Sequence, residues 1–92
     1  MTDDQLERYL QSVGKAAFVT HLGLFQARQS NDDTAGELEA VTGWKPLACR
    51  TRVSNARAIL KAGRLADALD LIVLARVPYH VQKAARLMRA AL

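Results

Sequence analysis

The sequence contains little cysteine, histidine or aromatic residue. It has one cysteine, two histidines, one tryptophan, two tyrosines and two phenylalanines. A single cysteine excludes an internal disulfide and any cysteine-cluster metal site. We therefore expect a protein of a reducing cytoplasm, most simply that of a bacterium, which binds neither a metal ion nor another cofactor.

Long hydrophobic runs are also missing. The longest uncharged stretch, residues 16–27, is 12 residues long, whereas a membrane-spanning helix needs about 18 or more apolar residues. The N-terminus carries Asp3, Asp4 and Glu7, where a secretory signal carries positive charge. We expect neither a membrane span nor a signal peptide.

No group of residues has the spacing of a catalytic site. His21 and His80 match no metal-ligand motif, and the five glycines are too dispersed to form a phosphate-binding loop. Cys49 falls on a predicted buried helix face, where cysteine behaves as a small hydrophobic residue. We therefore predict that the protein is not an enzyme.

What the sequence does contain is helical periodicity from end to end. Of the 92 residues, 50% are hydrophobic and 24% are charged, which is the composition of a globular domain. Apolar residues recur at helical spacing, and no segment alternates as a strand would. We predict an all-α fold in which residues 1–92 form a single domain, a compact bundle of five to six short helices. The N-terminal helices would occupy residues 3–28, a helix-turn-helix about 34–62, and the C-terminal helices 64–91.

Local signals set the predicted helix boundaries. Thr2 with Gln5, and Thr34 with Glu37, have the spacing of capping boxes, which predicts helices beginning near residues 3 and 35. Glycine often ends a helix, and proline fits the first turn of one. We therefore expect helices to end at Gly43 and Gly63 and a helix to begin at Pro46. The predicted inward faces are Ala17, Phe18, Leu22 and Phe25 in a helix over about 15–28, Leu38 and Val41 in 35–42, and Cys49, Val53, Ala56 and Leu60 in 46–62.

Charge divides the chain into two unlike halves. Residues 1–44 carry three basic and seven acidic side chains, whereas residues 45–92 carry ten basic and two acidic ones. No carboxylate occurs in the 23 residues from Gly43 to Leu65. A solvated helix face normally mixes both signs, so this stretch favours contact with a polyanion such as DNA.

The segments 34–42 and 46–62 have the parts of a helix-turn-helix, in which the second helix enters the major groove of DNA. Residues 34–44 resemble the first helix and turn of bacterial and phage helix-turn-helix regulators, and the resemblance extends over residues 34–63. Three features depart from the usual pattern: Glu39 replaces a small residue, Thr42 replaces an apolar one, and the second helix starts about one residue late. The residues from Trp44 to Val53 are also loosely similar to extended-turn variants in mobile-element regulators.

The second helix provides the predicted DNA contacts. Opposite its core face, one stripe contains Arg50, Ser54, Arg57 and Lys61, and the adjacent stripe contains Thr51 and Asn55. Arginine bonds guanine and asparagine bonds adenine, while serine and threonine serve bases or phosphates. Lys45 and Arg64, at the ends of the helix, would contact phosphates.

A second basic patch lies on the last helix. Lys83, Arg86 and Arg89 occupy its predicted outer side. They would clamp flanking phosphates, or present a surface to another protein, or simply complement the negative end of the helix dipole.

These observations predict a small DNA-binding protein, a transcriptional regulator or accessory factor of prophage or mobile-element type. We expect a homodimer formed through the acidic N-terminal helices, because the basic faces repel one another and small helix-turn-helix proteins usually bind paired half-sites. The alternative is a helical adaptor or inhibitor that binds a regulator or polymerase component without contacting DNA.

Overall fold

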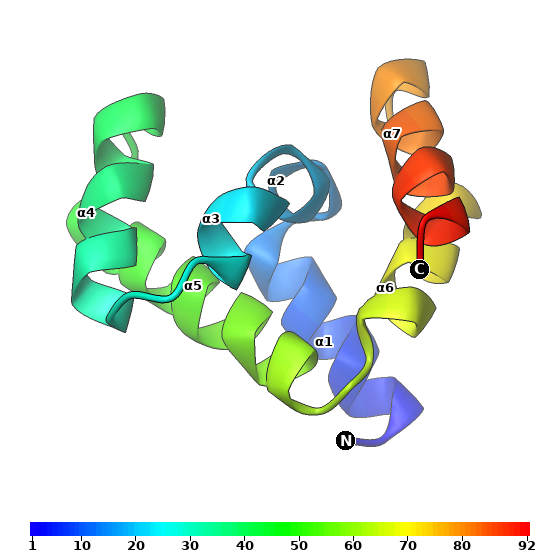
Figure 1. Cartoon of the computed structure of the whole chain (residues 1–92), viewed down its shortest axis with the longest axis horizontal. Helices are drawn as coiled ribbons and strands as arrows, with labels where there is room; N and C mark the ends of the chain where they lie inside the picture. The colour runs from blue at the N-terminus through cyan, green and yellow to red at the C-terminus, as the bar shows by residue number, and fades with distance from the viewer.

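The computed structural model describes all 92 residues, which form seven α-helices joined by short connections (Figure 1). The prediction of an all-helical fold is confirmed, with seven helices in place of five or six. None of these helices has the length and apolar character needed to traverse a lipid bilayer. The helices are α1 (Asp3–Val13), α2 (Lys15–Thr20), α3 (Leu22–Gln26), α4 (Asn31–Thr42), α5 (Pro46–Lys61), α6 (Leu65–Val73) and α7 (Tyr79–Ala90).

Several predicted helix ends are confirmed. The Thr2 hydroxyl oxygen accepts from the Gln5 amide at 3.2 Å, and the Gln5 side chain accepts from the Thr2 amide at 2.9 Å, so the capping box is complete. Gly43 ends α4 in the left-handed conformation with φ +73°, which glycine adopts without steric cost. Pro46 is the first residue of α5, where no backbone donor is needed.

Two predicted boundaries are wrong. The helix expected from residue 35 begins at Asn31, because Ser30 rather than Thr34 caps it: the Ser30 hydroxyl accepts from the Asp33 amide at 3.0 Å. Thr34 is therefore inside α4, where it is buried. The single helix expected over residues 15–28 divides into α2 and α3 at His21, whose backbone leaves the helical conformation (φ −113°, ψ 18°).

Helix α5 lies at the centre of the fold. It packs against α1, α4, α3 and α6, while α6 and α7 form a pair at the opposite end of the molecule from α4 (Figure 1). Cys49, Val53 and Ala56 are buried as predicted, but the fourth buried position of α5 is Ile59, and Leu60 is only half-buried. Val41, expected to face inward, is instead 66% exposed.

One core cluster of 18 buried residues joins all the helices. Phe18, Leu22 and Phe25 belong to it. These apolar side chains of the N-terminal helices are thus buried within the chain itself and are not available to the expected dimer contact.

Candidate nucleic-acid interface

The side of α5 opposite its core face is open to solvent. Five of the residues predicted to contact DNA are exposed there, and no carboxylate belongs to α5 or to the connections on either side of it. These exposed residues are Lys45, Arg50, Thr51, Ser54 and Lys61. We call these five residues the α5 face.

Arg50 is the one arginine of the α5 face. Its Nε lies 4.0 Å from Oδ1 of Asp32, and the two side chains are 66% and 85% exposed. An ion pair this long and this exposed contributes little to stability. Arg50 is therefore available to a partner.

Arg57, in contrast, does not belong to the α5 face. Its guanidinium turns back onto the connection between α3 and α4 and uses all five of its N–H donors. Nε donates to the Phe25 carbonyl (3.1 Å), Nη1 to the Gln29 carbonyl (2.7 Å) and Asn31 Oδ1 (2.8 Å), and Nη2 to the Ala27 carbonyl (2.9 Å) and the Thr34 hydroxyl (2.7 Å).

The reason lies in the end of α3. The last carbonyls of a helix have no partner within the helix, and α3 is followed by irregular backbone over residues 27–30. A guanidinium presents five donors in a fixed planar arrangement. One side chain therefore donates to the Phe25 carbonyl in α3 and to the Ala27 and Gln29 carbonyls that follow it. The prediction that Arg57 faces outward to DNA is therefore wrong.

Arg64 also has partners within the chain. Its Nε donates to Asp67 Oδ2 at 2.6 Å, and its Nη atoms donate to the Met1 carbonyl and to Asp3 Oδ1 at 2.6 and 2.5 Å. The hydrogen bond to Asp3, followed by that to Asp67, raises the pKa of Arg64. Arg64 thus connects the start of α1 to the start of α6. It is not directed at an external phosphate, in contrast to the expectation from the sequence.

Asn55 lies at the junction of α5 and α1, where its Nδ2 donates to the Ser12 hydroxyl at 2.8 Å. Arg52, which the sequence did not single out, donates from Nη1 to the Val13 carbonyl at 2.8 Å and lies 4.1 Å from the centre of the Trp44 ring. Both side chains attach α5 to its surroundings. Asn55 is half-buried and has only part of its amide free for a base.

A shallow groove between α1 and α5 extends the α5 face. Two depressions of about 440 and 320 Å³ meet at Ser12. Lys45 lies in one of them and Arg8 in the other, and no carboxylate lines either. Sequence analysis missed Arg8 because it belongs to the acidic half of the chain. Its signal was its position on α1, four residues before Ser12.

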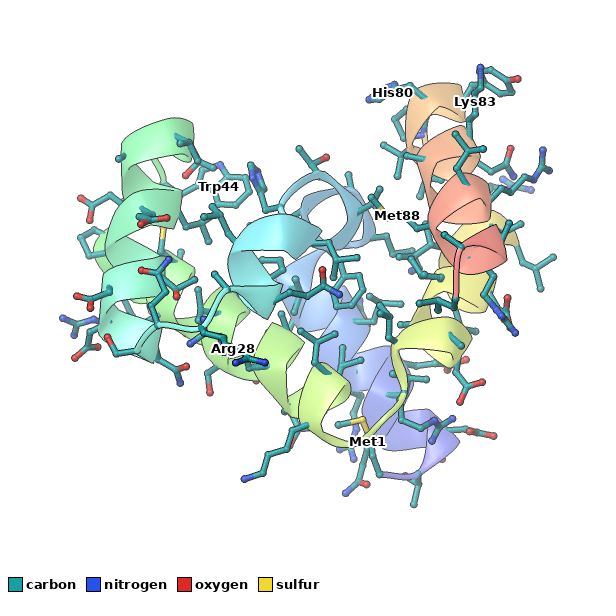
Figure 2. The ribbon with its side chains drawn as sticks, in the orientation of Figure 1. Met1, Arg28, Trp44, His80, Lys83 and Met88 are labelled. Carbon is teal, nitrogen blue, oxygen red and sulfur yellow. The ribbon has the colours of Figure 1, made fainter.

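The second basic patch predicted from the sequence, on α7, is separate from the α5 face. Lys83 and Arg86 are exposed, but Arg89 pairs with Asp70 of α6 through a 3.0 Å contact. Helix α7 packs on α6 and α2 (Figure 1). The structure therefore separates the two basic surfaces, and Lys83 and Arg86 lie on the helix at the other end of the molecule from α4 (Figure 2).

The connection between α4 and α5 explains why Thr42 replaces the apolar residue that is usual at this position of a helix-turn-helix sequence. The Thr42 hydroxyl donates to the Leu38 carbonyl at 2.7 Å and accepts from the Trp44 amide at 3.1 Å. A polar residue at this position thus satisfies backbone groups on both sides of Gly43. Trp44 then packs edge-on against His21, with 5.7 Å between the ring centres.

Comparison of the chain with protein families, with curated proteins and with solved structures found no match.

The arginine contacts lead to a test of stability. Replacing Arg57 by alanine (Arg57→Ala) leaves several backbone carbonyls without a donor, so we expect a loss of about 2–4 kcal/mol in the free energy of unfolding. Arg50→Ala removes the same group from an exposed position, and we expect a change within about 0.5 kcal/mol. Urea denaturation followed by circular dichroism measures both. Equal losses in the two variants would contradict the assigned roles.

His21 leads to a test of pH dependence. Burial, and then the positive charge of Arg52, lower the pKa of His21 from its usual 6.5. The unfolded chain therefore binds a proton at His21 more readily than the folded chain does, and stability decreases as the pH falls through about 6.5. We expect His21→Gln to flatten the decrease in unfolding free energy between about pH 7.5 and 5. A parallel profile for the wild type and His21→Gln would contradict this assignment.

Proposed function

We propose that this chain is a DNA-binding protein in which α4 and α5 act as a helix-turn-helix and the α5 face enters the major groove. Three residues, 43–45, separate the two helices, which pack against each other. A short connection and a longer second helix are the features that a helix-turn-helix requires. The proposed role is regulatory and not catalytic, as in the phage and bacterial regulators that residues 34–63 resemble.

The observation that carries this proposal is the sign of the charge along α5. The α5 face has three cations and no carboxylate, and the groove beside α1 adds Arg8. These cations extend over the whole helix, a length of about 24 Å for its 16 residues. The major groove is about 12 Å wide and admits one α-helix, so the helix ends would meet the phosphates on the two sides of the groove.

This placement gives each residue a different role. Lys45 and Lys61 lie at opposite ends of α5, and Arg8 lies at its flank, so these three would contact phosphates and position the protein. Arg50, Thr51 and Ser54 lie between the ends, where they would face base edges. Arg50 is the one guanidinium on this face, and arginine makes bidentate hydrogen bonds to guanine.

Salt dependence tests the phosphate contacts. Three cations on phosphates predict that the logarithm of affinity falls against the logarithm of salt concentration with a slope of about −2.7 per chain. We expect the double variant Lys45→Ala/Lys61→Ala to flatten this slope by about 1.8. Fluorescence anisotropy with a labelled random duplex, at a series of salt concentrations, measures the slope.

The matched control removes two cations elsewhere. Arg76→Ala/Lys83→Ala alters the net charge by the same amount at exposed positions on the α6–α7 connection and on α7. The slope of this variant should equal that of the wild type. If both double variants change the slope equally, only the net charge matters and the α5 face is not the binding surface.

A protein partner on the same face is the second candidate. It is favoured by Leu47, which lies at the beginning of the α5 face and is 74% exposed. An adaptor would bury this side chain, and its binding would persist at high salt. If a protein partner binds this face, Leu47→Gln should weaken the complex and Lys45→Ala/Lys61→Ala should not. If DNA binds there, Lys45→Ala/Lys61→Ala should weaken the affinity for DNA and Leu47→Gln should leave it unchanged.

A further inference from the structure

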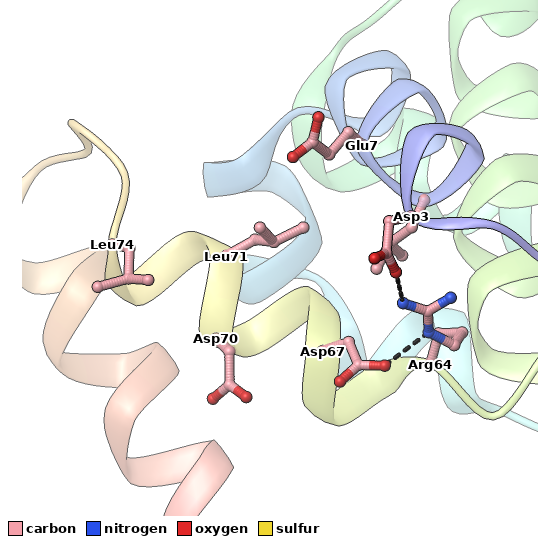
Figure 3. A pocket seen from close by; sticks show the side chains of 8 residues that line it. Asp3, Glu7, Arg64, Asp67, Asp70, Leu71 and Leu74 are labelled. Carbon is pink, nitrogen blue, oxygen red and sulfur yellow. Dashed lines mark hydrogen bonds and ion pairs between the residues drawn. The ribbon is translucent and has the colours of Figure 1, made fainter.

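A cleft between α1 and α6 lies away from the α5 face. Its volume is about 260 Å³, and its apolar lining comes from Leu6, Leu71 and Leu74. Four carboxylates surround this lining (Figure 3). They are Asp3, Glu7, Asp67 and Asp70.

The basic edge of α7 borders this cleft across α6. The Arg89 guanidinium lies 3.0 Å from Asp70, which lines the cleft, and Gln82 donates to the Val73 carbonyl at 2.6 Å. These two contacts define the side of α7 that lies next to α6. Arg86 follows Gln82 by four residues and precedes Arg89 by three, which places it on the same side of the helix. No carboxylate occurs after Asp70.

The surface therefore runs from the carboxylates of Asp3, Glu7 and Asp67, through Leu71 and Leu74 beside the paired Asp70, to the basic side of α7. We call this the α1–α6–α7 surface. Leu74, between the two charged parts, is 85% exposed. Leu74 extends the apolar lining of the cleft, formed with Leu6 and Leu71, out to the surface.

One charge toward each end of the α1–α6–α7 surface has no ion-pair partner within the chain. Asp3 and Asp67 pair with Arg64, and Asp70 pairs with Arg89. Glu7 and Arg86 make no ion pair, and both are exposed. One end of the α1–α6–α7 surface thus offers a free carboxylate and the other a free guanidinium.

We propose that the α1–α6–α7 surface binds the same surface of a second copy of this chain. In a two-fold dimer, each contact between two residues occurs twice with the roles exchanged. A surface that is acidic at one end, apolar in the middle and basic at the other end complements itself after such a rotation. Leu74 of the two protomers meets near the axis, and Glu7 of each protomer faces Arg86 of its partner.

This dimer does not depend on DNA binding. The α5 face and the α1–α6–α7 surface have no residue in common, so either can be tested without the other. If the chain dimerises and fails to bind DNA, the proposed function is wrong and this inference stands.

The role of Leu74 is tested by light scattering after size-exclusion chromatography, which measures the oligomeric state of the full chain without DNA. We expect a concentration-dependent dimer, and we expect Leu74→Gln to raise its dissociation constant at least about tenfold. Leu47→Gln makes the same change at another exposed leucine and should leave the constant unchanged. A wild-type chain that is monomeric at about 1 mM, or that forms open-ended oligomers, would overturn the proposal.

Charge reversal tests the pairing. Glu7→Lys and Arg86→Glu each place like charges opposite each other, so each should weaken the dimer about tenfold. The double variant Glu7→Lys/Arg86→Glu exchanges the two signs and should restore dimerisation to within about threefold of the wild type. Both substitutions are at exposed positions, and circular dichroism verifies the fold. A double variant weaker than either single variant would mean that the two residues do not face each other.

Discussion

The five hydrogen bonds of Arg57 are the constraint on which the arrangement around α5 depends. They fix the backbone between α3 and α4 against the middle of α5, and α4 starts directly after this backbone. The Thr34 hydroxyl, buried inside α4, obtains its donor from the same guanidinium. The position of α4 beside α5 thus depends on one side chain that a conventional view of α5 would assign to a ligand.

Local signals in the sequence were sufficient to predict most of the secondary structure. The capping pair Thr2 and Gln5, the left-handed Gly43 and the N-terminal Pro46 act within a few residues of their own position, and each is where the sequence indicated. The beginning of α4 was missed because Ser30 and Thr34 are both good capping residues. The choice between them depends on the burial of Thr34, which is a tertiary effect.

The candidate site was less predictable because long side chains do not follow the direction of their Cα–Cβ bonds. Arg57 lies at the edge of the predicted outer stripe, and its side chain is long enough to return to a backbone segment about 30 residues away in sequence. Arg64 likewise reaches Asp3, 61 residues earlier. Helical periodicity correctly placed Arg50, Ser54 and Lys61 on the outside, where all three are exposed.

The surroundings of Trp44 make it an internal optical reporter. It is the only tryptophan of the chain, and it lies in the connection between α4 and α5, against the His21 ring and the Arg52 guanidinium. Because the chain has no other tryptophan, indole emission from the native protein originates from this single place, next to an imidazole and a guanidinium. Emission intensity therefore monitors the junction of α4 and α5 directly, without an added label.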